Sequence, residues 1–289
     1  MRSIDSPEPR RFSPCGTIEA RFALAMSAVL FVLLTLLHVG LALGLRVPLP
    51  PGVPAAAVVT VATTLFSVLH AWTLLGPRRL GLFFGLSAVV SWIFEEIGVR
   101  TGLVFGAYHY TDLLGPKVLD VPLLIPLAWF AMTYPSYVIA TCILEGRPSP
   151  DRRSSGLAGW RTLLAGCVMT AWDLVMDPRQ ARAGAWVWPH GGAWFGVPLH
   201  NFAGWMVTTT TVYLLYELGQ RRIGTAPPRT MSTAAGLLPV LVYAVTALRY
   251  AIENDYGVMA VVAVFAMGVP CLFAVARVLT AQAGPAKDG

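Results

Sequence analysis

The chain has 289 residues, of which 56% are hydrophobic and only 12% charged, and its mean hydropathy is +0.64. A soluble domain carries about 25% charged residues, so this composition leaves no room for a sizeable soluble domain. The formal net charge of +6 could suggest a nucleic-acid partner. Loop arginines of a membrane protein explain it better, because no basic stretch is interleaved with exposed aromatic residues, and we expect no nucleic-acid partner.

The apolar residues fall into eight runs, most of them about 20 residues long, which is the length that a helix needs to cross a bilayer. Proline and glycine residues separate several runs and indicate short loops. We therefore predict an all-α fold, a polytopic integral membrane helical bundle of about eight transmembrane helices. The expected spans are 22–45, 55–76, 79–99, 121–144, 157–176, 202–219, 232–252 and 257–280.

Together the spans form a single transmembrane domain, residues 22–280, between two tails. Residues 1–21 are polar and Arg-rich and are expected to be a disordered cytoplasmic tail, and 281–289 a second disordered tail. Counted with the adjoining span ends, the two tails and the loops after even-numbered spans hold fifteen Lys and Arg residues, whereas the other loops hold six. By the positive-inside rule, this asymmetry predicts a multi-pass protein of the cell membrane with both termini in the cytoplasm.

Four acids lie at or inside the ends of two spans: Glu95 and Glu96 in the third, and Asp173 and Asp177 in the fifth. A carboxylate in or near hydrocarbon is costly, so an acid there is a functional-site hypothesis by default. Both spans run toward the outer face. The sixth helix begins at the same face, with Asn201 near its start. We therefore take the four acids as candidate catalytic residues of one site.

Two stretches of the sequence are similar to each other. Each has an acid, Glu96 or Asp173, ten or eleven residues before a Gly-Ala-aromatic-x-aromatic element, and each has seven residues from a proline to Trp129 or Trp205. An internal duplication would make spans 3–4 and 5–6 two parallel hairpins that face each other across a site. The alternative is that Gly, Pro and aromatic residues simply recur at membrane interfaces.

The orientation of each acid follows from helix geometry. Adjacent helix residues point about 100° apart, so only one of Glu95 and Glu96 can face the bundle centre squarely. We prefer Glu96 because it aligns with Asp173, and Glu95 would then reach the interface or pair with Arg100. Asp173 and Asp177 share one helix face. The alternatives are an ordinary interfacial helix end for the glutamates and an Asp-Pro turn for Asp177.

Aromatic residues are frequent in the two outer loops and beside them. An interfacial belt explains most of them by default, whereas the alternative is a binding surface for a flat, extended hydrocarbon, on which aromatic faces also stabilise a passing cation. The candidate substrate-binding residues are Tyr108, Tyr110, Trp129, Trp172, Trp186, Trp188, Asn201 and Trp205.

The histidines offer little for metal or redox chemistry. The five of them include no HxxxH or HxxH pair, and the chain has no P-loop, dinucleotide, GxSxG or zinc-protease motif. We expect no cofactor and no metal. The alternative is a mononuclear metal site formed by His109, His190 and His200 with a carboxylate.

Two segments carry a resemblance to a known family. The first runs from Glu95 to Trp129 through EEIG, FGAY and PLAW, and the second runs from Asp173 to Trp205 through DLVMDP, WVW and GVPLHNFAGW. Together they resemble the membrane carotenoid 1,2-hydratases of the bisanhydrobacterioruberin hydratase type, a carotenoid biosynthesis family. The resemblance covers roughly residues 85–220, and the flanking helices match only in hydrophobicity.

The resemblance implies an activity and a substrate class. The activity is the cofactor-independent addition of water to the terminal C1=C2 double bond of an acyclic carotenoid ψ-end group, which gives a tertiary alcohol. The implied substrate is lycopene, γ-carotene or an elongated C50 precursor. Membrane lipid and other carotenoid enzymes are the remaining expected partners.

The acids suit this chemistry. A protonated carboxylic acid can protonate the alkene, while an ionised one stabilises the cation and takes a proton from the attacking water. We assign Glu96 or Asp173 as the proton donor, and the other of that pair or Asp177 as the group that orients water. Asn201 and Tyr108 would hold the water.

Two other functions remain open. A lycopene cyclase would use the same protonation and let an internal alkene capture the cation. A small proton-coupled transporter would also need acids within the membrane. A carrier should have a polar path through both halves of the bundle, and here the cytoplasmic half of the spans is almost uniformly apolar.

Overall fold

The structure, a computed structural model, describes residues 18–49, 52–150, 156–223, 231–253 and 257–283, and it is 77% helical. This confirms the predicted all-α fold, and each predicted span overlaps a helix. The helices are α1 (Ile18–Ala42), α2 (Ala55–Leu75), α3 (Pro77–Thr101), α4 (Leu124–Glu145), α5 (Ala158–Arg182), α6 (Leu199–Gln220), α7 (Thr233–Gly236), α8 (Leu238–Glu253), α9 (Gly257–Val262) and α10 (Val269–Ala283), with a π-helical segment, Ala263–Gly268, between the last two.

Five helices are long and apolar enough to cross a membrane: α1, α2, α3, α4 and the continuous helix Gly257–Ala283. The remaining long helices, α5, α6 and α8, are shorter or more polar. The sequence of α5 contains the two candidate aspartates and three arginines, and that of α6 has His200 and Asn201 in its first turn. The count of eight transmembrane helices therefore stays a prediction.

The predicted tails fall mainly outside the described residues, which exclude 1–17 and 284–289. Helix α1 begins at Ile18, four residues before the predicted span, and α10 ends at Ala283, three residues after the predicted one.

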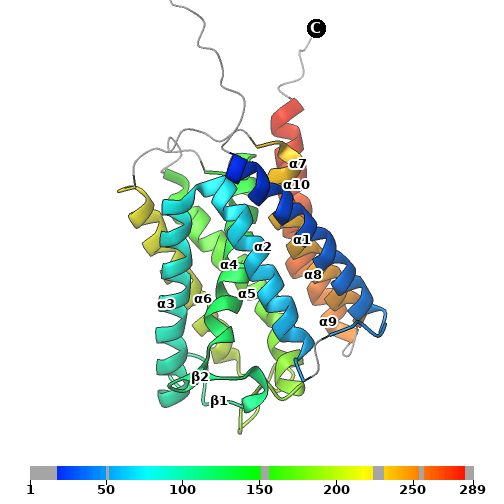
Figure 1. The fold of residues 1–289 in the computed structure, drawn as a ribbon. Helices are drawn as coiled ribbons and strands as arrows, with labels where there is room; N and C mark the ends of the chain where they lie inside the picture. The colour runs from blue at the N-terminus through cyan, green and yellow to red at the C-terminus, as the bar shows by residue number, and fades with distance from the viewer. Residues whose placement is uncertain (1–17, 50–51, 151–155, 224–230, 254–256, 284–289) are drawn as a thin grey trace, which may run out of the picture.

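Helix α4 is the centre of the bundle. It packs against α2, α3, α5, α8 and α10, and most of its residues are buried. Helix α3 packs on α6, while α1 lies at the edge against α2 and α8. Figure 1 shows the N-terminal end of α1 and the C-terminal end of α10 at the same end of the bundle, with β1 and β2 at the opposite end.

Short strands join the two loops at that opposite end. Strand β1 (His109–Tyr110) pairs antiparallel with β4 (Trp186–Val187), and β2 (Lys117–Val118) pairs with β3 (Val121–Pro122). The indole nitrogen of Trp188 also donates to the carbonyl oxygen of Phe105 at 3.0 Å. The loop after α3 and the loop after α5 are thereby held together as one cover over this end of the bundle.

Gly204 lets α6 approach this cover closely. A Cβ atom at position 204 would lie 2.1 Å from the carbonyl oxygen of Val104, which is far inside contact distance. Only glycine allows the helix to lie so near the backbone that follows α3, and Trp205 is the next residue along α6.

The half of the bundle near the termini is not uniformly apolar, contrary to the sequence-based expectation. Arg161 is only 2% exposed, and its Nε donates to Oε1 of Glu217 at 2.6 Å while Nη1 bonds to Glu145. The hydroxyl of Tyr137 donates to the same Glu217 oxygen at 2.7 Å. The expectation was wrong because these three charged residues, near the ends of α4, α5 and α6, are buried together. Their mutual pairing offsets the cost of burying each charge.

Candidate active site

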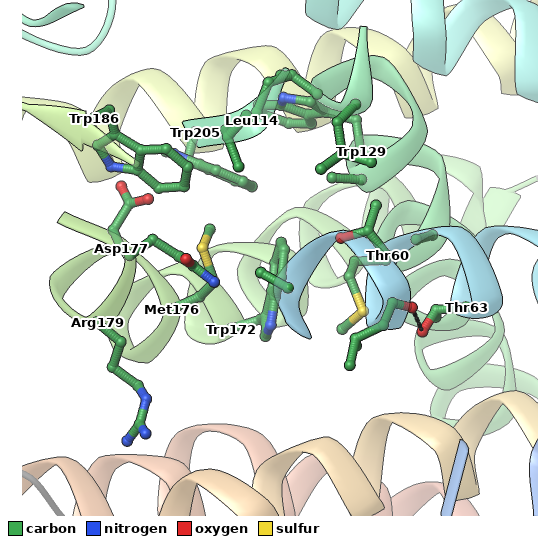
Figure 2. A pocket seen from close by; sticks show the side chains of 18 of the residues that line it. Thr60, Thr63, Leu114, Trp129, Trp172, Met176, Asp177, Arg179, Trp186 and Trp205 are labelled. Carbon is green, nitrogen blue, oxygen red and sulfur yellow. Dashed lines mark hydrogen bonds between the residues drawn. The ribbon is translucent and has the colours of Figure 1, made fainter. Parts of the chain in front are cut away.

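A cavity of about 130 Å³ lies inside the bundle and is lined by residues of α1 to α6, α8 and the two covering loops. In Figure 2, Asp177 and Trp186 lie at one side of it and Thr60 and Thr63 at the other, with Trp172 between them. All eight residues predicted to bind substrate line this cavity; they are Tyr108, Tyr110, Trp129, Trp172, Trp186, Trp188, Asn201 and Trp205.

Glu95 is the glutamate that faces the cavity. It is 4% exposed and accepts three hydrogen bonds: from the hydroxyl of Tyr108, from the hydroxyl of Tyr110 at 2.7 Å, and from the indole nitrogen of Trp129 at 2.9 Å. Helix α3, the loop after it and α4 each contribute to this cluster. Three hydrogen-bond donors around one carboxyl group favour its ionised form, which can only accept hydrogen bonds.

The two tyrosines of this cluster lie in the loop outside the helices and are buried. Burial first, and then the charge of Glu95, raise the pKa of Tyr108 and of Tyr110 well above the usual value for a phenol. Both hydroxyls therefore keep their protons and serve as donors to Glu95.

Glu96, the glutamate preferred from the sequence, points elsewhere. Its Oε1 lies 2.5 Å from Nε of Arg100, and its Oε2 accepts from the backbone N–H of Asp120 at 3.2 Å. Glu96 does not line the cavity. The prediction exchanged the roles of the two neighbours: Glu96 makes the pairing with Arg100 that was considered for Glu95.

The two aspartates of α5 come together, as their spacing predicted. The amide nitrogen of Asn201 donates to Oδ2 of Asp173 at 2.9 Å and to Oδ2 of Asp177 at 2.5 Å. Among the described residues, neither aspartate forms an ion pair with a basic side chain. Asp177 lines the cavity with Glu95, whereas Asp173 is fully buried behind it.

The aromatic residues of the loops are part of the cavity rather than an interfacial belt. Tyr108, Tyr110, Trp186 and Trp188 are at most 8% exposed. Tyr108 lies against Trp188 and Tyr110 against Trp186, with ring centroids 5.8 Å apart in each pair. The belt interpretation was wrong for these four because the strand pairing of the two loops turns their side chains inward.

The family model described as carotenoid biosynthesis protein matches residues 55–276, which is most of the chain. The chain belongs to the carotenoid biosynthesis protein family. The matched region contains Glu95, Asp173, Asp177 and Asn201, and every residue that lines the cavity except His38 lies within it.

A curated protein also resembles the chain in sequence. Bisanhydrobacterioruberin hydratase of Haloarcula japonica is 32% identical over 148 residues, which cover 51% of this chain and 48% of that protein. The chain thus spans about half the length of the curated relative that it matches. No solved structure matches the chain.

Several cavity residues of this carotenoid biosynthesis protein were missed from the sequence. They come from the flanking helices: Thr60 and Thr63 from α2, His38 from α1, and Thr246 and Arg249 from α8. The signal for them was weak but present, since each is a polar residue within an otherwise apolar run.

The three histidines considered as metal ligands do not form such a site. Within the described ranges, no three His, Cys, Asp or Glu side chains come together as a metal site would require. His109, His190 and His200 are also absent from the lining of the cavity.

Proposed function

We propose that this protein adds water across the terminal C1=C2 double bond of an acyclic carotenoid ψ-end group and so forms a tertiary alcohol. One observation carries the proposal: Asp177 and Glu95 line the same aromatic cavity, but the groups that surround their carboxyl oxygens differ in kind. Asp177 lies beside a second carboxyl group, whereas Glu95 is surrounded by donors. Hydration of an alkene needs a proton donor and a base that accepts a proton from the attacking water, and an ionised carboxylate separate from the donor can be that base.

The aspartate pair is the proposed proton donor. Two carboxyl groups that face one amide without a basic partner repel each other when both are ionised, so the pair retains one proton. Asp177 is the member that reaches the cavity, and Asp173 behind it shares the remaining charge. This revises the assignment from the sequence, in which Glu96 or Asp173 donated the proton.

Glu95 is the proposed base and cation stabiliser. Its three donors hold the carboxylate in one position, and preorganised charge of this kind stabilises a developing cation without further rearrangement. The aromatic side chains that line the same cavity, among them Trp129 and Trp172, add cation–π stabilisation.

The proposed reaction balances without a redox partner. The Asp177 proton goes to the less substituted alkene carbon, and the positive charge develops on the tertiary carbon. A water molecule held by Asn201 and Tyr108 attacks that carbon, and its released proton goes to Glu95. The cycle closes when this proton returns to the aspartate pair, which faces the same cavity.

We also propose a location and a substrate class. Lycopene, γ-carotene and C50 precursors all present an extended hydrocarbon, and such a molecule would enter from the bilayer. The five apolar helices support a multi-pass membrane protein, and the N-terminal end of α1 and the C-terminal end of α10 lie at the same end of the bundle. With the asymmetry of Lys and Arg residues in the sequence, this supports the proposal that both termini lie in the cytoplasm.

The direct test is expression in a lycopene-producing bacterium followed by mass analysis of the extracted pigments. We expect a product heavier than lycopene by one water molecule. An isomeric product would indicate a cyclase instead, since an internal alkene would have captured the cation. Solute flux in proteoliposomes without any pigment change would indicate a transporter.

A further inference from the structure

The residues that line the cavity reach the molecular surface in two groups. Most lining residues are buried, and the partly exposed ones on α2 and α4 are apolar apart from one threonine: Ala56, Val59, Thr60, Leu124 and Ala128. The partly exposed ones on α5 and α8 are all polar, namely Arg179, Gln180 and Arg249, and we call these three the polar rim. Charged side chains of a membrane bundle face its interior or water rather than hydrocarbon, so the polar rim does not suit the passage of a carotenoid.

One carboxylate of α8 holds the two arginines of the polar rim in place. Oε2 of Glu253 pairs with Nη2 of Arg179, and Oε1 of Glu253 accepts from Nε of Arg249 at 2.7 Å. Both guanidinium groups also lie over the ring of Tyr250, 5.3 Å and 5.9 Å from its centroid. The three charged side chains are 12% to 18% exposed, so they are fixed at the edge of the cavity rather than extended into solvent.

The polar rim begins beside the proposed proton donor. Gln180 follows Asp177 by three residues on α5, and residues three apart are neighbours on one helix face. Figure 2 shows the Arg179 side chain extending from this helix end away from Asp177 and Trp186. Helices α5 and α8 end nearby, at Arg182 and Glu253, where a multi-pass chain turns at an aqueous face. The rim therefore lies between the surroundings of Asp177 and that face.

The proposed hydration consumes one water molecule in each turnover, so the cavity must be refilled while a hydrocarbon occupies it. The aromatic and aliphatic wall offers a passing water molecule no hydrogen bonds, and a water molecule without partners is costly in an apolar space. The amide of Gln180 and the guanidinium groups of Arg179 and Arg249 offer hydrogen bonds at the edge of this space.

We propose that the polar rim is the water inlet of the cavity and supplies the water molecule that attacks the cation. The use of this water in hydration rests on the proposed function, whereas its entry into the cavity does not. Where the inlet is closed, the alkene is still protonated, but the cation loses a proton from a neighbouring carbon to Glu95 and the alkene re-forms. Supply of water through the rim therefore decides between hydration and a return to the starting carotenoid.

The first test measures water entry without substrate. Brief X-ray radiolysis of the purified full chain in detergent micelles produces hydroxyl radicals from water, and mass analysis finds the side chains that they oxidise. Met176 lines the cavity three residues before Arg179, whereas Met169 is fully buried on the same helix and does not line the cavity. We expect Met176 to be oxidised several times faster than Met169. Arg249→Leu should slow the oxidation of Met176 about fivefold, which is the effect of losing one hydrogen bond to the entering water.

A second pair of variants keeps the test decisive where Arg249→Leu does not fold. Gln180→Leu should also slow the oxidation of Met176, whereas Arg182→Leu should leave it unchanged, because Arg182 is exposed at the same helix end but does not line the cavity. The proposal is overturned if Met176 is oxidised as slowly as Met169 in the wild-type protein, or if its oxidation rate is the same in the wild-type protein, Arg249→Leu and Gln180→Leu.

The second test follows the fate of the cation with lycopene in D₂O. A deuteron from Asp177 adds to C2, after which capture by water gives the alcohol and loss of a proton returns a carotenoid that carries deuterium. We expect the ratio of alcohol to deuterated carotenoid to fall about fivefold in Arg249→Leu and Gln180→Leu and to stay unchanged in Arg182→Leu.

This ratio separates water supply from a structural defect. A variant that only disturbs the fold lowers both products together and leaves the ratio unchanged, and that result in Arg249→Leu and Gln180→Leu would overturn the role of the rim in hydration. A wild-type protein that forms neither product would contradict the proposed function, while the oxidation of Met176 would still decide whether the rim admits water.

Discussion

Trp129 and Trp205 stack face to face, with ring centroids 4.1 Å apart and planes inclined by 16°. They occupy matching positions in the two similar stretches of the sequence, each seven residues after a proline. In the β1–β4 pair, His109 lies opposite Val187, and these residues also match between the stretches. Contact between equivalent residues is what a two-fold axis produces, so both contacts support an internal duplication with the axis passing through the cavity.

The first prediction concerns the proposed proton donor. Asp177→Asn removes the acidic proton that faces the cavity, and general acid catalysis contributes about 100-fold or more, so we expect at least this loss in hydration rate. The measurement is the rate of formation of hydrated pigment by purified protein. Asp112→Asn is the control, since that carboxylate is fully exposed and should change the rate less than about twofold. An active Asp177→Asn variant would remove Asp177 from the mechanism.

The donors to Glu95 provide a second prediction. Tyr108→Phe removes one of its three hydrogen bonds and leaves those from Tyr110 and Trp129. Hydrogen bonds to charged groups contribute about 1.5–3 kcal/mol, so we expect kcat to fall about tenfold with KM nearly unchanged. A variant in which only KM changed would show that Tyr108 contacts the substrate without positioning the carboxylate.

A third prediction concerns the close approach at Gly204. Gly204→Ala forces a Cβ atom against the backbone of Val104, so the variant should lose about 1–3 kcal/mol of stability, as overpacked sites do. Gly159→Ala is the matched control, because a Cβ atom there meets nothing within 4 Å and alanine favours the helix. Thermal unfolding in detergent micelles measures both, and equal melting temperatures would contradict the account.

The buried charge cluster near the termini gives a fourth prediction. Arg161→Met leaves Glu145 and Glu217 buried without their shared cation, and breaking such a pair costs about 3–5 kcal/mol. Arg147→Met, at a side chain that is 47% exposed, should cost no more than about 1 kcal/mol. Denaturant unfolding compares the two, and hydration per folded molecule should stay unchanged in both.

Much of this site could be predicted from the sequence. The acids, the aromatic residues and Asn201 were found because polar groups in apolar runs are informative in a membrane protein. The orientation of Glu95 could also have been found: the gapless offset of 78 residues that aligns Gly106 with Gly184 aligns Glu95, not Glu96, with Asp173. The prediction failed because it allowed a shift of one residue, which turns a helix by about 100°.

Other features could not be predicted from one sequence. His38 and Thr246 lie more than 200 residues apart, and only the packing of α1 on α8 places them in the same cavity. The inward turn of Tyr108 and Trp186 depends on the β1–β4 pairing, which is too short to leave a periodic pattern. Arg161 was counted with the loop charges, and only the packing of the helices shows that it pairs with Glu145 and Glu217 inside the bundle.

The most direct test of the central claim compares two neighbouring substitutions, Glu95→Gln and Glu96→Gln, in a lycopene-producing host. Each removes one carboxylate from the same helix end, but only Glu95 faces the cavity. The account predicts that Glu95→Gln lowers the yield of hydrated pigment by about 100-fold, as expected for loss of a catalytic base, while Glu96→Gln stays within about threefold of the wild-type yield. Hydrated pigment at wild-type levels from Glu95→Gln, with none from Glu96→Gln, would contradict it.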